Sequence, residues 1–120
     1  MDTGGQELHI PRLSEIVRAV CDHYGTSEID LLSDRRAREF ARPRQVAMWL
    51  GRKLTFRSLP EIARFLRRGD HTTVMHGIKV IDHLVATDFE FANAVHSIRR
   101  RVGARVLVRE ALEETLRDAA

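Results

Sequence analysis

A run of eleven residues, Arg67-Arg68-Gly69-Asp70-His71-Thr72-Thr73-Val74-Met75-His76-Gly77, separates two segments with helical periodicity. Within it, Gly69 suits a left-handed turn and Asp70 is a preferred helix N-cap. Upstream, Ser58-Leu59-Pro60-Glu61 has the form of a capping box with proline in the first turn, which predicts a short helix to about residue 66. Two helices joined by a short turn that contains glycine indicate a helix-turn-helix.

The second helix of this pair is expected over residues 71–86, with an inward stripe of Val74, Ile78, Ile81 and Val85. Its outer face then carries His71, Thr72, Met75, His76 and Lys79. The N-terminal residues of the second helix of a helix-turn-helix contact base edges in the major groove. Short polar side chains and the methyl group of Thr72 suit that position, and Thr73 suits a backbone phosphate.

The rest of the chain supplies a helical scaffold. Residues 11–24 are expected to be helical between Pro11 and Gly25, and residues 27–32 form one capped turn that buries Ile29, Leu31 and Leu32. Because proline breaks a helix interior, the main helix is placed at residues 43–54, or earlier with a kink at Pro43. Its outer face and N-terminal end are assigned Arg42, Arg44, Gln45 and Arg52.

Beyond Asp88 the pattern predicts a helix with Phe89, Ala92, Val95, Ile98 and Val102 inward, interrupted at Gly103. Residues 105–119 form a last amphipathic segment. Its stripe of Leu107, Leu112 and Leu116 has two interpretations: a helix docked on its own core, which we favour, or a dimerisation surface. No stretch alternates with period two, so the fold class is all-α.

These patterns divide the chain into three parts. Residues 1–9 are expected to be a flexible N-terminus, residues 10–101 a helix-turn-helix domain, and residues 102–120 a C-terminal helical extension.

The basic residues are concentrated in one window. Residues 35–68 hold eleven Lys or Arg, ten of them Arg, and only two acids, which gives a formal charge of +9 against +3 for the whole chain. The remainder therefore carries −6. Such an asymmetry within one small domain favours a polyanion-binding face, and arginine suits bidentate contacts to phosphate and guanine. The alternative is a solvated basic surface.

Several other classes of function are disfavoured. The single cysteine, Cys21, allows no disulfide within the chain and no cysteine-rich zinc site, and the six histidines lack a matching set of metal ligands. No phosphate-binding glycine motif is present, so neither a nucleotide site, a cofactor nor an enzyme is expected. Asp70 beside His71 is better explained as an N-cap than as an acid–base pair. No export signal or membrane span is apparent, which favours the cytoplasm.

Five segments in order resemble the C-terminal DNA-binding domain, domain IV, of the bacterial replication initiator DnaA. They are Leu31-Leu32-Ser33, Arg35-Arg36-x-Arg38, Ala41-Arg42-Pro43-Arg44-Gln45-x-Ala47-Met48, Leu54-Thr55-x-x-Ser58-Leu59-Pro60-Glu61-Ile62, and Asp70-His71-Thr72-Thr73-Val74-x-His76. The resemblance runs from about residue 10 to residue 98. It implies a Trp-repressor-like helix-turn-helix fold, with an extra C-terminal helix in this chain.

The resemblance also implies roles for individual positions. Asp70, His71 and Thr72 would contact bases of a nine-base-pair DnaA box in double-stranded DNA. Phosphate or groove contacts would come from a larger polar set: Arg35, Arg36, Arg38, Arg42, Arg44, Gln45, Arg52, Arg67, Arg68, Thr73 and His76. The expected function is sequence-specific binding at DnaA-box-like sites, in the nucleoid, that modulates replication initiation or transcription. The replication initiator or other replication proteins are the further partners expected.

The chain departs from the family pattern at two points. The family has a minor-groove arginine directly before Asp70, where this chain has Gly69, while Arg67 and Arg68 stand where small residues are usual. The ATPase domain of the initiator is not recognisable in these residues, so no ATPase activity is expected. An alternative function is a protein–protein adaptor that reuses the fold and binds a replication or regulatory partner through its C-terminal amphipathic segment. The oligomeric state is left open.

Overall fold

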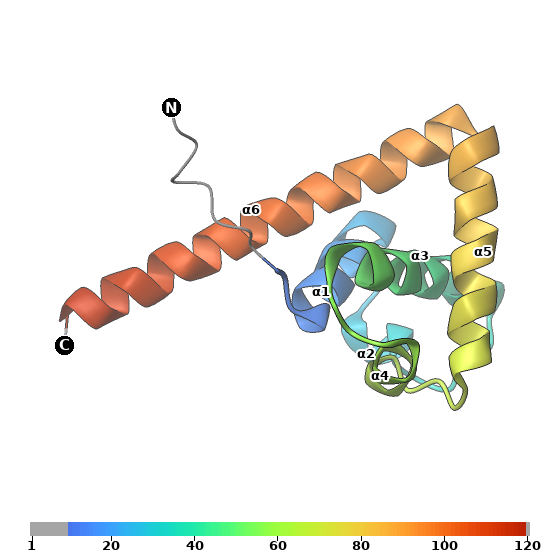
Figure 1. Cartoon of the computed structure of the whole chain (residues 1–120), viewed down its shortest axis with the longest axis horizontal. Coiled ribbons are helices and arrows are strands. Elements are labelled where there is room, and N and C mark those ends of the chain that lie inside the picture. The colour runs from blue at the N-terminus through green and yellow to red at the C-terminus, as the bar shows by residue number, and fades with distance from the viewer. Residues whose placement is uncertain (1–9, 120) are drawn as a thin grey trace.

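The computed structural model describes residues 10–119, which form six α-helices and no strand. The expected all-α fold is therefore confirmed over these residues, whereas the N-terminal segment 1–9 lies outside them. The helices in chain order are α1 (Leu13–Tyr24), α2 (Glu28–Leu31), α3 (Arg38–Leu54), α4 (Leu59–Phe65), α5 (His71–Thr87) and α6 (Phe89–Ala119). In Figure 1, α3 lies at the centre of the domain, and α6 crosses beside α1 and continues beyond it.

The expected caps set the ends of the short helices. The Ser58 hydroxyl accepts a hydrogen bond from the Glu61 amide at 3.2 Å, and the Glu61 carboxylate accepts one from the Ser58 amide at 2.8 Å. This reciprocal pair is the predicted capping box of α4. At the end of α1, Gly25 has φ 66°, a left-handed conformation that costs glycine little. The first helix begins at Leu13, two residues later than expected, with Arg12 as its N-cap.

The main helix begins at Arg38 and contains Pro43 in its interior, so the earlier of the two expected starts is correct. An interior proline removes one backbone hydrogen bond. Here both Pro43 and Phe40, almost one turn earlier, are buried. The burial of these two side chains against the domain offsets the missing bond and keeps residues 38–42 helical.

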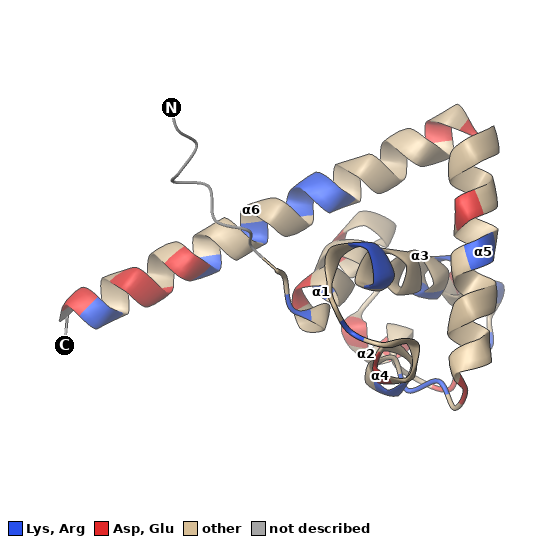
Figure 2. Ribbon diagram, in the orientation of Figure 1, with Lys and Arg blue, Asp and Glu red and all other residues tan. Residues whose placement is uncertain are grey.

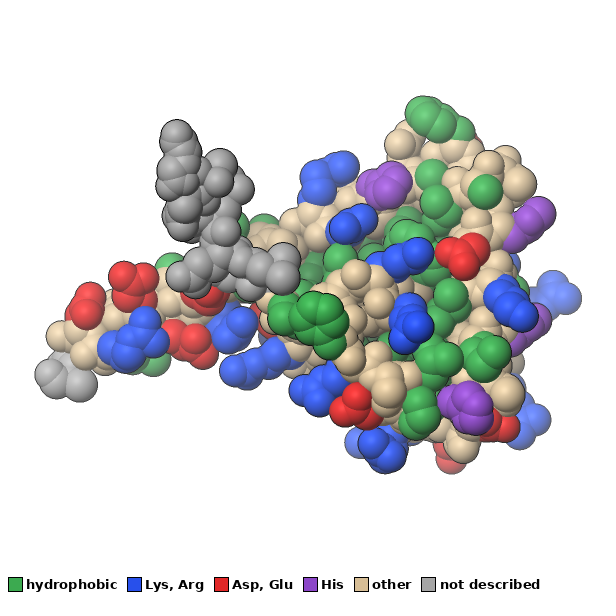
Figure 3. Space-filling model, viewed as in Figure 1, with side chains coloured by type: hydrophobic (Ala, Val, Ile, Leu, Met, Phe, Trp, Pro, Cys, Tyr) green, Lys and Arg blue, Asp and Glu red, His purple; other side chains and the backbone are tan. Residues whose placement is uncertain are grey.

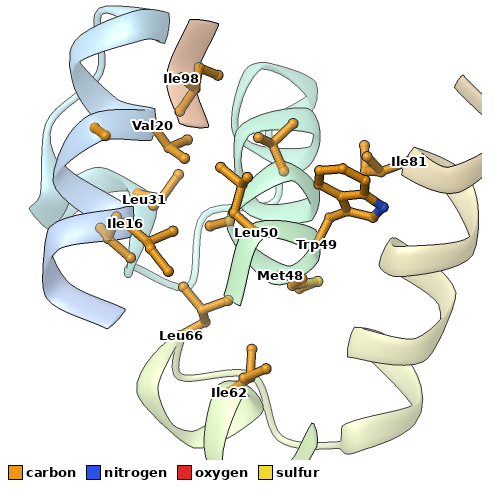
Figure 4. Packing of buried hydrophobic residues seen from close by; sticks show 14 of the residues in the cluster. Ile16, Val20, Leu31, Met48, Trp49, Leu50, Ile62, Leu66, Ile81 and Ile98 are labelled. Atoms are coloured by element: carbon orange, nitrogen blue, oxygen red, sulfur yellow. The ribbon is translucent and has the colours of Figure 1, made fainter. Parts of the chain in front are cut away.

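The core gathers side chains from every helix around α3. Figure 4 shows Ile16 and Val20 of α1, Leu50 of α3, Ile81 of α5 and Ile98 of α6 converging on one cluster. Trp49 is also buried, and its indole N–H donates a hydrogen bond to an Asp82 carboxylate oxygen at 2.7 Å. This bond ties the middle of α5 to α3, so the position of the second helix of the helix-turn-helix is fixed well beyond its N-terminus.

The closest approach of α5 to α3 is at Gly77. A Cβ atom at this position would lie 2.6 Å from the Met48 sulfur and 3.3 Å from Cγ of Gln45. Because a side chain of any size would collide there, glycine lets the two helices pack closely. This contact places Gln45 of α3 directly beside the first turns of α5.

Three sequence-based expectations about the core are wrong. Ile29 is 83% exposed, because the single turn of α2 directs Leu31 inward and leaves Ile29 on the opposite side. Phe89 is 79% exposed because it is the first residue of α6, at the corner that follows α5; Phe91 is half-buried instead. Gly103 does not interrupt α6: Val102 and Val106 on either side of it are buried, and that burial outweighs the roughly 1 kcal/mol helical cost of glycine.

The C-terminal stripe is not docked on the core either. Leu107, Val108, Leu112 and Leu116 are all large apolar residues that remain exposed, and the last turns of α6 project past the rest of the domain (Figure 1). The favoured interpretation of this stripe is therefore wrong. None of the described helices combines the length and apolar character that a membrane crossing requires.

Candidate nucleic-acid interface

The N-terminus of α5 presents a row of polar side chains to solvent. Asp70 is its N-cap: a carboxylate oxygen accepts a hydrogen bond from the Thr72 amide at 2.9 Å. The hydrogen bond from this amide holds the pKa of the Asp70 carboxyl below its ordinary value, so the cap is ionised at neutral pH. His71 Nδ1 lies 3.4 Å from the same carboxylate oxygen. The predicted cap is confirmed.

The outward face predicted for α5 is confirmed as well. His71, Thr72, Thr73, Met75, His76 and Lys79 are exposed, while Val74 and Gly77 between them are buried. Figure 3 shows histidine and basic side chains along the edge of the molecule that α5 forms. The unpaired amide groups of a helix N-terminus add a partial positive charge that attracts anions. This edge is consequently suited to a polyanion.

The turn between α4 and α5 differs in detail from the expected one. Arg67, not Gly69, adopts the left-handed conformation, with φ 58°. Its neighbour Arg68 donates its amide to the Ala63 carbonyl at 2.8 Å, which closes the C-terminal end of α4. A left-handed residue is needed just past the helix end, and in this chain that position falls two residues before the glycine. Gly69 stands in open space.

The basic loop, residues 33–37, connects α2 to α3 and leads into Arg38. Arg35, Arg36 and Arg38 are exposed, and their contact with a DNA backbone stays a prediction. Arg35 stays near the surface carboxylate of Asp30, at 3.8 Å. Exposed ion pairs of this kind contribute little to stability, so Arg35 can exchange this partner for a phosphate at small cost.

Arg44 is the clearest correction to the expected site, because only 6% of it is exposed. Its guanidinium donates to four backbone carbonyls: Leu31 at 2.7 Å, Arg35 at 2.6 Å, Ser33 at 2.9 Å and Asp30 at 3.3 Å. It also lies over the Phe40 ring. The outer-face placement is therefore wrong. The five donors of a guanidinium match the converging carbonyls at the end of α2, and this match draws the side chain inward.

Burial and the nearby charge of Arg68, in that order, lower the pKa of Arg44 from its ordinary value, against an opposite effect of Asp34. An arginine nonetheless stays charged at neutral pH. Arg44 consequently supplies a fixed positive charge beneath the basic loop while its hydrogen bonds hold the loop backbone in place.

Arg68 is the second arginine that the fold uses internally. It is half-buried, and its guanidinium donates to the Ser33 carbonyl at 2.5 Å and to the Leu66 carbonyl at 3.0 Å. Arg44 binds the same Ser33 carbonyl. We call Arg44, Arg68 and the Ser33 carbonyl the arginine clasp. It joins the basic loop to the turn of the helix-turn-helix, whereas Arg67 remains exposed.

The remaining predicted side chains lie on α3. Arg42 is exposed and donates to the Gln45 side-chain oxygen at 2.8 Å; Gln45 is half-buried against α5, and Arg52 is exposed two turns further on. Residues seven apart on a helix share a face, so Arg38, Gln45 and Arg52 form one line along α3. The fold thus brings the start of α5, the turn, the basic loop and one side of α3 into a single region.

One residue of this region was not included in the predicted site. A depression of about 310 Å³ between α4 and the start of α5 is lined by Arg64 together with Arg68, Asp70 and His71. Arg64 belongs to the basic window. Its position in the last turn of the helix before the helix-turn-helix turn was the sequence signal that could have assigned it to the site. Among residues 10–119, no group of three or more His, Cys, Asp or Glu side chains is arranged to hold a metal ion.

The comparisons with known proteins agree with this geometry. A family model described as the bacterial DnaA protein helix-turn-helix matches residues 13–81, from the start of α1 into α5. This chain belongs to the DnaA helix-turn-helix family. Every residue of the predicted site falls within the matched range.

Relatives in this family include chromosomal replication initiators. The chromosomal replication initiator protein DnaA of Bartonella quintana is 49% identical over 92 residues, which cover 77% of this chain and 19% of the relative. The initiator of Caulobacter vibrioides is 44% identical over 90 residues, covering 75% of this chain and 18% of the relative. The chain therefore spans about a fifth of the length of these DnaA relatives.

A solved structure gives the same result in three dimensions. A crystal structure of a DNA replication initiation factor superposes with a TM-score of 0.70 at 34% sequence identity, over 78% of this chain and 29% of that one. The expected resemblance to the DnaA family, and the helix-turn-helix fold that it implied, are thus confirmed.

Proposed function

We propose that this chain binds double-stranded DNA at DnaA-box-like sites, with the N-terminus of α5 in the major groove. The observation that carries the proposal is the exposed row at the start of α5, held by the ionised Asp70 cap and flanked by the basic loop and α3. The N-terminal residues of the second helix of a helix-turn-helix reach base edges, while the surrounding structure contacts the backbone.

In this proposal Asp70, His71 and Thr72 read bases. The phosphate contacts come from side chains that are not engaged within the core: Arg35, Arg36, Arg38, Arg42, Gln45, Arg52, Arg67, Thr73 and His76, with Arg64 added at the edge of the turn. Arg44 and Arg68 are assigned a different task, because the arginine clasp occupies their donors. They orient the basic loop relative to α5.

In the cell, this chain would act as a DNA-binding protein at the sites that the replication initiator binds. Occupancy of such sites at an origin or a promoter modulates replication initiation or transcription, by competition or cooperation with the initiator. The proposed function requires no ATPase activity of this chain, since it consists of DNA binding alone. The place of action is the nucleoid, where the DNA is.

The decisive experiment is selection from a random duplex pool, followed by affinity measurements on the selected site and on unrelated duplex. His71→Ala is expected to reduce the preference for the selected site by about 1–3 kcal/mol, because a base contact is lost while the phosphate contacts remain. His83→Ala is the matched control. It removes an exposed histidine from the same helix, twelve residues from His71, and leaves the preference unchanged.

Two results would contradict the proposal. A wild-type chain that selects no sequence and binds no duplex at low salt is not a DNA-binding protein. If His71→Ala leaves specificity as it was, DNA binding occurs without the proposed groove placement of α5.

A further inference from the structure

Among residues 10–119, the C-terminal part of α6 is the long helical segment that the domain leaves largely uncovered. The buried residues of this helix are Val95, Ile98, Val102 and Val106, and none follows Val106 among the side chains that the structure describes. The ion pair between Arg109 and Glu15, at 3.2 Å, ties α6 to the start of α1. Beyond it the helix continues to Ala119 and projects from the domain (Figure 1).

A row of apolar side chains runs along one face of this segment. Val108, Leu112 and Leu116 are spaced four residues apart, and together with Ala104 they line an open groove of about 640 Å³ beside α1. Leu112 is 60% exposed and Leu116 is 70% exposed. Three large apolar side chains in one row on a projecting helix are the pattern of a helix–helix contact with a missing partner.

The charges along α6 show which partner fits. Residues 99–109 hold five arginines and no acid, whereas residues 110–118 hold four acids and one arginine. Figure 2 shows this change from basic to acidic along the projecting helix. Arg105 and Arg109 already pair with Asp22 and Glu15 of α1. Arg101, which lines the groove, is left to face the acidic end of a second α6, and only an antiparallel copy brings that end beside it. An anionic membrane would instead require basic residues beside the apolar row at the projecting end.

We propose that a second copy of this chain packs its α6 antiparallel against this face, so that two protomers form a symmetric dimer. With the two-fold axis between Val108 and Leu112, Val108 of one protomer meets Leu112 of the other. Leu116 then meets the small side chain of Ala104, and Arg101 lies beside the acidic end of the opposite helix. Such a contact is isologous, because each residue pair occurs twice.

The pairing buries the exposed apolar row of both copies. It also places Arg101 of each protomer beside the acidic end of the other protomer's α6. Burial of leucine and valine side chains supplies the driving force, and the charges select the antiparallel over the parallel arrangement. The two α5 helices of the dimer belong to separate domains held by a common pair of α6 helices. The inference does not depend on the DNA-binding function, because its surface lies outside the proposed interface.

The first test is the molar mass of the full chain in solution across a concentration series, by sedimentation or by light scattering. The wild-type chain is expected to reach twice the 13.8 kDa monomer mass as concentration rises. Leu112→Glu should remain monomeric, because it places a charge in the centre of the apolar row. Leu107→Glu is the matched control: Leu107 is equally exposed, at 59%, but does not line the groove, so this variant should still dimerise.

The direction of the pair is tested by cross-linking. Ala104→Cys chains mixed with Leu116→Cys chains and oxidised should give the mixed disulfide in preference to either homodimer. Cys21 does not interfere, since it is buried and burial raises the pKa of its thiol to about 11. Far-ultraviolet circular dichroism of each variant establishes that it is folded.

Three outcomes overturn the proposal. The first is that the wild-type chain is monomeric at every concentration. The second is that Leu107→Glu disrupts the dimer as strongly as Leu112→Glu does, and the third is that disulfides form preferentially between identical positions. The first outcome would assign the row to a partner of different sequence.

Discussion

At the scale of single residues, the arginines of the basic window separate into two groups with different tasks. Arg44 and Arg68 direct their guanidinium groups at backbone carbonyls, and Arg67 remains exposed in a left-handed turn. In sequence, Arg67 and Arg68 are adjacent and indistinguishable. Their difference arises from the turn: Arg67 itself adopts the left-handed conformation and stays exposed, whereas the amide of Arg68 closes the end of α4 and its guanidinium reaches the Ser33 carbonyl.

This division predicts different salt dependences for two neighbouring substitutions. Arg68→Ala should weaken DNA binding by about 1 kcal/mol through loss of the arginine clasp, but leave the slope of log K against log salt unchanged. Arg67→Gly, which keeps the left-handed turn, should reduce the magnitude of that slope by about 0.9, the value for one lost phosphate contact. Titrations at several salt concentrations measure both. A slope reduced by Arg68→Ala would show that Arg68 leaves Ser33 to contact phosphate.

At the scale of elements, the interface depends on how closely α5 packs on α3. Gly77 permits the close approach, and the Trp49–Asp82 hydrogen bond fixes the same two helices further along. Helix α5 supplies the proposed base contacts, and α3 supplies part of the proposed phosphate contacts. A change in their spacing should therefore alter stability and DNA binding together.

Two glycine substitutions in helices should then have opposite effects. Gly77→Val places methyl groups into the contact with Met48 and Gln45, and is expected to lower the free energy of unfolding by about 1–3 kcal/mol. Gly103→Ala meets no atom within 4 Å and should raise the free energy of unfolding by about 0.5–1 kcal/mol, the gain in helix propensity. Urea denaturation measures both values. Equal effects would mean that Gly77 does not set the spacing.

At the scale of the whole molecule, the formal charge is unevenly placed. The basic window covers α3, α4 and the turn, and a group of four acidic residues, Glu110, Glu113, Glu114 and Asp118, lies towards the end of α6, which projects away from the domain. This separation keeps the acids of α6 away from the proposed DNA surface. It allows a chain of small net charge to present a strongly positive face.

From this distribution we expect DNA binding that is steeply dependent on salt. If six to eight side chains contact phosphates, log K should fall against log salt with a slope of about −5 to −7. Fluorescence anisotropy with a labelled duplex between low and moderate salt measures this slope. A slope near −1 would be inconsistent with a broad phosphate-binding surface, even if the affinity at low salt were high.

The amino-acid sequence by itself determined the helix-turn-helix. The capping box at Ser58, the cap at Asp70 and the apolar periods of α3, α4 and α5 are local signals, because capping and periodicity act within a few residues. The family was recognisable for the same reason, since its motifs are short and ordered along the chain.

Only the tertiary structure decided which polar residues are available and which apolar residues are covered. The burial of Arg44 depends on carbonyls up to fourteen positions away, and the bond from Arg68 to Ser33 joins residues thirty-five positions apart. The exposure of Leu112 and Leu116 follows from the length by which α6 passes the domain. Such facts depend on contacts distant in sequence, and no local pattern contains them.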